Sequence, residues 1–113
     1  MALKKQNRLL GKDFLKNKKN GFWGRGVFLN IKINKNNFPE SRFGFIVGLN
    51  ISKKAVVRNL IKRRLRSIAE KNLPFIKKGF DIIVITRPQI VEKNYKKIEK
   101  DVLGALEQLK LLN

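Results

Sequence analysis

The hydrophobic positions of this chain follow two different periods, which divide it into strands and helices. Residues 25–34 alternate between apolar and polar side chains, and this predicts a strand with one buried face. Its apolar positions are Val27, Leu29, Ile31 and Ile33. Residues 42–50 alternate in the same way, whereas residues 81–87 are almost continuously apolar. A continuous apolar run is typical of a central strand that is covered on both faces.

Two longer segments have apolar residues at helical spacing. The first predicts a helix over 53–71 with Ser52 as its N-cap, and the second predicts a helix over 94–112. A shorter helix is expected over 12–19, because Asn20 and Gly21 follow it as a stop signal. Residues 1–11 are basic with few apolar side chains, and they are expected to form a flexible, irregular arm.

The predicted order of elements is α-β-β-(β)-α-β-α, in which a further strand is placed within residues 21–26. Two substantial helices beside a small sheet predict an α+β fold, a two-layer α/β sandwich. A chain of 113 residues is the size of one domain, so residues 1–113 are expected to form a single unit.

The charge of the chain indicates its class of partner. Lysine and arginine number 27 and aspartate and glutamate number 8, which gives a formal net charge of +19. Hydrophobic residues make up 42% of the chain, enough for a packed core, so the chain is not simply a disordered polycation. A folded surface this positive favours a polyanionic partner, first nucleic acid and second an anionic membrane.

The residues that usually carry catalysis or bind metal ions are scarce. Cysteine and histidine are absent, and no motif for acid/base chemistry or metal binding groups the carboxylates. Asp81 is expected to cap its strand or to pair with a neighbouring lysine. Glu99, Asp101 and Glu107 are expected to be solvated on the surface of their helix.

The apolar runs are short. The longest covers residues 82–85, far less than a membrane span, and the first residues contain no stretch of signal-peptide length. We therefore expect a cytoplasmic protein without a membrane partner.

The most informative segment is the basic part of the helix over 53–71. Arg58, Lys62 and Arg66 recur every fourth residue, so they lie on one flank of the helix. An ordinary solvated helix mixes acids with bases, but no acid occurs between Asn50 and Ala69. This pattern predicts contact with phosphates. RNA is favoured, because no helix-turn-helix partner for binding DNA is apparent.

Four aromatic residues gather around the first helix and the first strand. They are Phe14, Phe22, Trp23 and Phe28. Phe28 falls on the polar face of its strand beside Lys32, where it is either partly buried under the first helix or part of a platform that stacks on bases.

Residues 52–66 read S-K-K-A-V-V-R-N-L-I-K-R-R-L-R and resemble the signature of the bacterial ribonuclease P protein subunit. The resemblance extends in order over nearly the whole chain. It includes the opening at 3–14, the strand at 43–47 and the Gly-Phe-Asp strand at 79–87.

The resemblance implies a ribosomal-protein-like domain whose βαβ crossover around the basic helix is left-handed, whereas the general rule predicts a right-handed one. It also implies a protein cofactor of ribonuclease P that binds the catalytic RNA and the 5′ leader of precursor tRNA and assists removal of that leader. The RNA would be the catalyst and would use Mg²⁺. The protein would bind no metal and no small-molecule substrate, and one monomer would join one RNA subunit.

The same resemblance assigns site residues by position. Those expected to bind the catalytic RNA are Lys53, Lys54, Arg58, Asn59, Lys62, Arg63 and Arg66. Those expected in the cleft for the leader are Phe14, Lys18, Phe28, Asn30 and Lys32. The chain departs from the family where Leu60 replaces a second arginine, beside the core stripe, and where residues 48–50 lack two lysines.

Three other functions remain open on the sequence. A ribosomal protein or general RNA chaperone would share the charge and the fold. A nuclease that acts without RNA would need histidine or a cluster of carboxylates, and the sequence has no histidine and no motif that groups its carboxylates. A protein of the membrane surface would need an aromatic interfacial face on its basic helix.

Overall fold

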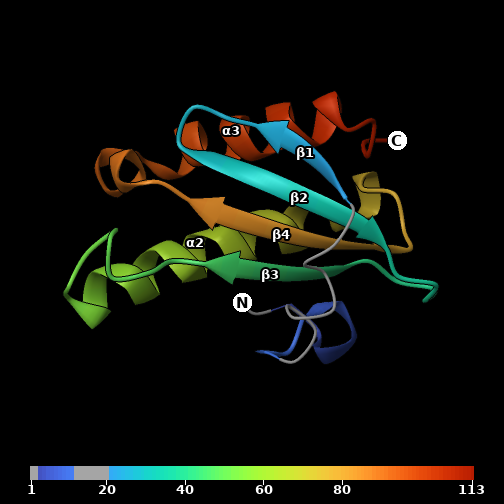
Figure 1. Ribbon diagram of the computed structural model, residues 1–113, viewed down its shortest axis with the longest axis horizontal. Coiled ribbons are helices and arrows are strands. Elements are labelled where there is room, and N and C mark those ends of the chain that lie inside the picture. Colours follow the sequence, from blue (N-terminus) through green and yellow to red (C-terminus); the bar gives the residue numbers. More distant parts are fainter. Residues whose placement is uncertain (1–2, 12–20) are drawn as a thin grey trace.

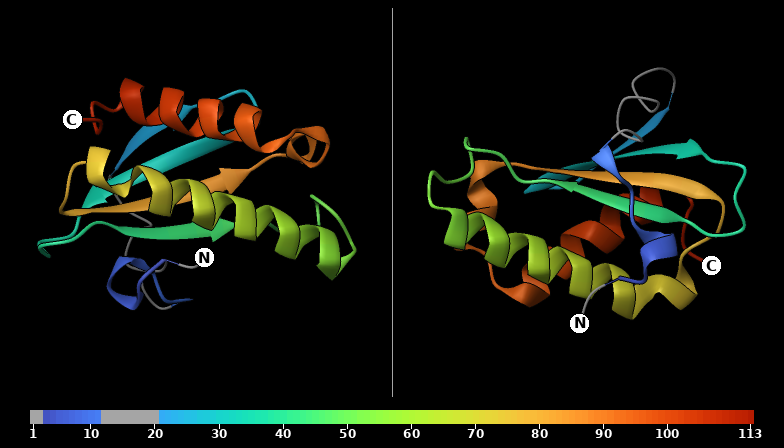
Figure 2. Two further views of the ribbon diagram at one scale, coloured as in Figure 1. Left: turned by 180° about the vertical axis from the view of Figure 1, so that it is seen from behind. Right: turned by 90° about the horizontal axis from the view of Figure 1, so that it is seen from below.

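The computed structural model describes residues 3–11 and 21–113 and consists of one sheet with two helices on one face (Figures 1 and 2). The strands are β1 (Phe22–Arg25), β2 (Leu29–Lys35), β3 (Arg42–Ile46) and β4 (Phe80–Thr86), in the spatial order β1-β2-β4-β3. The helices are α2 (Ala55–Asn72) and α3 (Tyr95–Gln108). Short 3₁₀ turns cover Lys5–Asn7, Leu73–Phe75 and Pro88–Glu92. The two-layer α+β prediction is confirmed.

Strand β4 holds the sheet together. It pairs antiparallel with β2 from Phe80 to Thr86 and parallel with β3, where Arg42 lies opposite Asp81. Five of its seven residues are buried, as the continuous apolar run predicts.

The connection from β3 through α2 to β4 is left-handed. The two strands run in the same direction and are neighbours, and α2 passes behind them in Figure 1 and in front of them in the reverse view of Figure 2. Most crossovers of this kind are right-handed, because strand twist favours that hand. The hand implied by the family resemblance is the one observed.

The single strand predicted over 25–34 is wrong at its beginning. Strands β1 and β2 form a hairpin in which Arg25 pairs with Asn30, so Val27 lies in the turn and is 70% exposed. The turn passes so close to α3 that a Cβ atom on Gly26 would lie 2.5 Å from a carboxylate oxygen of Asp101. A side chain at position 26 would displace the Asp101 carboxylate from the turn, and the apolar alternation continued across the turn without marking it.

The N-terminal segment also differs from the expected flexible arm. Leu3 is 2% exposed and belongs to the core, and Asn7 donates a hydrogen bond from Nδ2 to the backbone oxygen of Ser41, 2.9 Å away. The backbone N–H of Leu9 donates to the oxygen of Phe43 at 2.9 Å. The segment therefore lies along the outer edge of β3 (Figure 1). The helix expected over 12–19 lies outside the described residues.

Both long helices bury an apolar stripe against the sheet. The buried residues of these stripes include Ile61, Leu65 and Ile68 on α2 and Ile98, Val102 and Leu106 on α3. Each such side chain contributes roughly 1.5–3 kcal/mol when it leaves water. No helix among the described residues is both long enough and apolar enough to cross a membrane.

The starts of the two helices are built differently. Asn94 caps α3, because its Oδ1 accepts a hydrogen bond of 2.9 Å from the backbone N–H of Lys97. The N-cap of α2 is Lys54 rather than the predicted Ser52, and Lys54 makes no capping bond with its side chain. The hydroxyl of Ser52 instead accepts from the backbone N–H of Lys54 at 3.1 Å, which tightens the turn before the helix.

Candidate nucleic-acid interface

The N-terminal end of α2 concentrates positive charge. Lys53 and Lys54 precede the helix and are exposed, and the first turn contains no acid. The unpaired N–H groups and the dipole at a helix N-terminus favour anions. The guanidinium of Arg58 folds back onto this turn and donates from Nη1 to the backbone oxygen of Ser52 at 2.8 Å. This bond holds the basic turn against the helix.

The predicted flank of Arg58, Lys62 and Arg66 faces the edge of β3. Lys62 and Arg66 line a small cavity of about 130 Å³ whose apolar wall includes Phe43 and Phe45. Both cations are half-buried there. A compact cavity with two cations over an aromatic wall can hold a phosphate group and its sugar.

Arg8 joins this cavity from the N-terminal segment, and sequence reasoning missed it. Its position follows from the parallel bridge between Arg8 and Phe43, which joins residues far apart in the chain. The only signal in the sequence is the basic character of residues 1–11, which does not indicate where the segment docks. The flank of α2 and Arg8 together form one cationic surface, which we call the α2 edge.

Asn59 and Arg63 lie one turn apart on the outer surface of α2 and are exposed. Arg64, on the other flank, donates from Nη1 to the backbone oxygen of Lys93 at 3.2 Å. Within the part of the chain that the structure describes, no lysine or arginine from 53 to 66 forms an ion pair with a carboxylate. Apart from the bonds of Arg58 and Arg64 to backbone oxygens, the cations of this segment keep their charge available to an external anion.

The second predicted surface is the sheet face opposite the helices. Leu29, Ile31 and Ile33 are buried under the helices, so Asn30 and Lys32 point to the other face. Trp23 lies opposite Lys32 in the register, 53% exposed, with the Lys32 Nζ 5.8 Å from its ring centroid. An exposed indole beside an ammonium group can stack on a base and contact its phosphate.

Arg87 fixes the end of this face. Its guanidinium donates to Oδ1 of Asn30 and to the backbone oxygens of Gly26 and Val27, at 3.0 and 2.9 Å for the last two. Asn30 is thereby held in one orientation. Neither Trp23 nor Arg87 was among the predicted site residues. An aromatic residue before a basic strand was the signal available for Trp23.

The other residues predicted for the cleft are Phe28, Phe14 and Lys18. Phe28 is half-buried and packs at the margin of the core, and the Lys93 Nζ lies 5.0 Å from its ring. Phe28 is thus partly buried against the core, while the first helix, which one interpretation placed over it, lies outside the described residues. Phe14 and Lys18 lie outside the described residues. The structure brings Asn30 and Lys32 together with Trp23 and leaves Phe28 at the margin.

One titratable group near α2 has a shifted pKa. The Nδ2 of Asn72 donates a hydrogen bond of 2.9 Å to the carboxylate of Glu99, which lowers the pKa of that carboxyl, and Lys71 adds to the effect. The Lys71 Nζ lies 3.2 Å from the Glu99 Oε2. Glu99 therefore belongs to the contact between α2 and α3, contrary to the expectation that it is a solvated surface residue.

Comparisons with known proteins identify the family. The family model described as Ribonuclease P matches residues 3–110. The chain belongs to the ribonuclease P protein family.

Curated relatives in this family carry the name ribonuclease P protein component. The protein from Pseudanabaena sp. is 35% identical over 113 residues, and the match covers 98% of this chain and 97% of the relative. The protein from Cyanothece sp. is 35% identical over 78 residues. That match covers 69% of this chain and 60% of the relative, so it spans less than two thirds of the Cyanothece protein.

Solved structures of ribonuclease P proteins share the fold. The protein from Thermotoga maritima, in complex with 1-(4-fluorophenyl)-2-thiourea, is 33% identical with a TM-score of 0.82, and the match covers 89% of this chain and 98% of that one. The protein from Staphylococcus aureus is 26% identical with a TM-score of 0.84 over 95% of this chain and 98% of its own.

Proposed function

We propose that this chain is the protein subunit of ribonuclease P and that it assists the RNA subunit in removing the 5′ leader of precursor tRNA. The observation that carries the proposal is the α2 edge, where cations from 53 to 66 lack carboxylate partners among the described residues in a chain of this family. Uncompensated charge on a folded surface is stable when a polyanion neutralises it.

The two surfaces suit two different RNA ligands. The α2 edge is a rigid helix with a cavity for phosphate, which suits a folded RNA that is recognised by its shape and backbone. The sheet face presents Trp23 and Lys32, which suit an extended single strand with exposed bases. We assign the catalytic RNA to the first surface and the leader to the second.

In this proposal the chemistry belongs to the RNA. The described residues contain no group of three or more carboxylate, histidine or cysteine side chains placed to hold a metal ion. The Mg²⁺ that cleavage requires is accordingly assigned to the RNA subunit. The protein contributes binding and orientation, as one monomer for each RNA subunit, in the cytoplasm.

The test is cleavage of precursor tRNA at low Mg²⁺ with the protein alone, the RNA subunit alone, and both together. We expect cleavage at the mature 5′ end with both and little with either alone. Cleavage by the protein alone would identify a nuclease and refute the proposal. Tight RNA binding without stimulation of cleavage would instead favour a ribosomal protein or an RNA chaperone.

A further inference from the structure

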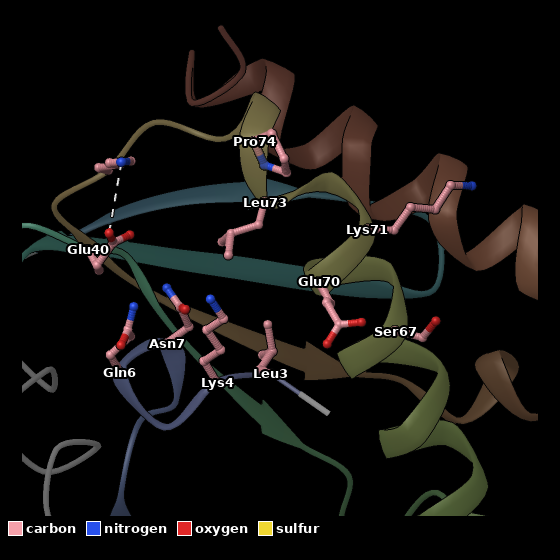
Figure 3. Close-up of a pocket in the computed structure, with 11 residues that line it drawn as sticks. Leu3, Lys4, Gln6, Asn7, Glu40, Ser67, Glu70, Lys71, Leu73 and Pro74 are labelled. Carbon is pink, nitrogen blue, oxygen red and sulfur yellow. Dashed lines mark ion pairs between the residues drawn. The ribbon is translucent and has the colours of Figure 1, made fainter. Parts of the chain in front are cut away.

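A second hollow lies where the N-terminal segment crosses the end of α2, and the proposed surfaces do not use it (Figure 3). It is an open groove of about 990 Å³. Its apolar walls are Leu3, which is buried, with Leu73 and Pro74 from the turn that follows α2. Lys4 and Lys78 also line it, together with the acids Glu40 and Glu70. The groove therefore combines apolar walls with charges of both signs.

Glu70 is the unusual residue of this groove. Its carboxylate points into the hollow in Figure 3. No hydrogen bond or ion pair of this carboxylate to another side chain occurs in the part of the chain that the structure describes. The neighbouring Lys71 turns away and pairs with Glu99 at 3.2 Å. A free acceptor in a chain of net charge +19 is placed to receive hydrogen bonds from a ligand.

We propose that this groove binds an unpaired guanine nucleotide of an RNA strand. The apolar walls cover the faces of the base, and the two oxygens of Glu70 accept from its N1–H and N2–H groups. Adenine, cytosine and uracil present at most one of these two adjacent donors on the same edge. Lys4 is placed to contact a flanking phosphate. A carboxylate that accepts two hydrogen bonds from one base gives selectivity as well as affinity.

The surroundings of the groove favour RNA over a cationic ligand. The net charge of +19 repels cations and attracts an anionic strand. The other acid in the groove, Glu40, already has the Lys78 Nζ at 3.8 Å. The groove also continues the α2 edge along two elements, because Arg8 and Arg66 line the cavity there while Asn7 and Ser67 line the groove. A strand held at the α2 edge can therefore reach it.

This inference rests on the proposed RNA-binding function, and its test separates the two. The full chain is titrated with the pentaribonucleotides UUGUU and UUAUU, and the backbone amide resonances are followed by NMR. We expect UUGUU to shift the amides of Leu3, Asn7 and Leu73 and to bind about fivefold or more tightly than UUAUU, the minimum for one lost bidentate contact.

The variant Glu70→Gln tests the carboxylate. A glutamine side chain offers one acceptor oxygen, and its NH₂ group opposes a guanine donor, so the preference for UUGUU over UUAUU should disappear. The matched control is Glu92→Gln, which removes the same charge from an exposed residue outside the groove and should keep the preference.

Two results would overturn the inference. One is equal binding of the two pentanucleotides by the unaltered chain, and the other is a set of shifted amides confined to the α2 edge or the sheet face. Either result leaves ribonuclease P function intact if the unaltered protein still stimulates cleavage of precursor tRNA. If the unaltered protein does not stimulate this cleavage, the proposed function itself is refuted.

Discussion

Helices α2 and α3 pack on the same face of the sheet, but they use their charged side chains in opposite ways. Helix α3 contains three lysines, at 96, 97 and 100, and three acids, at 99, 101 and 107. Two of these acids bind other parts of the fold. Residues 53–66, which cover the approach to α2 and most of its length, contain seven cations and no acid, and Glu70 follows near the end of the helix. The charge of α3 is balanced and partly internal, whereas that of residues 53–66 has no carboxylate partner among the described residues.

The contacts of α3 show what balanced charge does. Asp101 accepts hydrogen bonds from the backbone N–H groups of Val27 and Phe28, at 2.6 and 2.8 Å. Gln108 bonds both the N–H and the oxygen of Arg25, at 3.0 and 2.7 Å. These side chains fasten the β1–β2 hairpin, which carries Trp23. The polar side chains of α3 thus stabilise the fold through partners within the chain, whereas the cations from 53 to 66 have no carboxylate partner among the described residues.

The contrast between the two helices predicts that substitutions on the α2 edge cause the largest loss of affinity for RNA. The double variant Lys62→Ala/Arg66→Ala should weaken binding of the RNA subunit about 150-fold, at about 1.5 kcal/mol for each lost charge-assisted contact. The slope of log affinity against log salt should become shallower by about two units, one for each phosphate contact. Filter-binding titrations over a range of salt measure both quantities. An unchanged slope would show that these cations do not face phosphates.

The reciprocal change on α3 should affect folding and leave RNA binding alone. Asp101→Ala removes both hydrogen bonds to the hairpin turn and should lower the free energy of unfolding by about 1.5 kcal/mol. Urea denaturation measures this loss, with Glu107→Ala as the control, because Glu107 is exposed on the same helix. If the control loses as much stability, the loss reflects charge on α3 rather than the bonds of Asp101.

The contact between the two helices should make stability depend on pH. The hydrogen bond from Asn72 lowers the pKa of Glu99 in the folded protein. A lowered folded pKa stabilises the protein above the unfolded value of about 4.3, and this contribution disappears as pH falls through the folded pKa.

The variant Glu99→Gln removes this titration. We expect its free energy of unfolding to fall less steeply than that of the unaltered protein between about pH 5 and pH 3. The same measurement on Glu107→Gln should retain the original slope. If the free energy of unfolding falls equally steeply with pH in the unaltered protein and in Glu99→Gln, another carboxyl group controls unfolding in acid.

The sequence predicted most of the elements that depend on a local period. The helix over 53–71 is observed as Ala55–Asn72, and the central strand over 81–87 is observed as Phe80–Thr86. The strand predicted over 25–34 is wrong at its beginning, because Val27 lies in a hairpin turn and yet continues the alternation of apolar and polar residues. Docking of Leu3 could not be predicted, because its partners lie far away in the chain.

The same limit applies to the site. The residues of α2 were predicted because a helix places every fourth residue on one flank, and their arrangement on this helix follows the prediction. Their role in binding RNA stays a prediction. The positions of Arg8 and Trp23 depend on strand register, which composition does not encode. Asp81 was expected to cap its strand or to pair with a neighbouring lysine, but it bonds Arg42 at 2.8 Å, a partner from the parallel neighbour strand.

The smallest expected effect concerns the position where α2 departs from its family. Leu60 is 41% exposed rather than packed in the core stripe, so an arginine there should change the free energy of unfolding by less than about 0.5 kcal/mol. If α2 lies along the RNA backbone, Leu60→Arg should strengthen binding about threefold and steepen the salt slope by about one unit. Glu107→Gln is the matched control, because it raises the net charge by the same one unit on α3. A gain in Leu60→Arg alone would mean that the position of a charge matters, as the comparison of the two helices requires. An equal gain in both variants would mean that RNA responds only to the total charge, and that the segregation of charge on α2 does not define the interface.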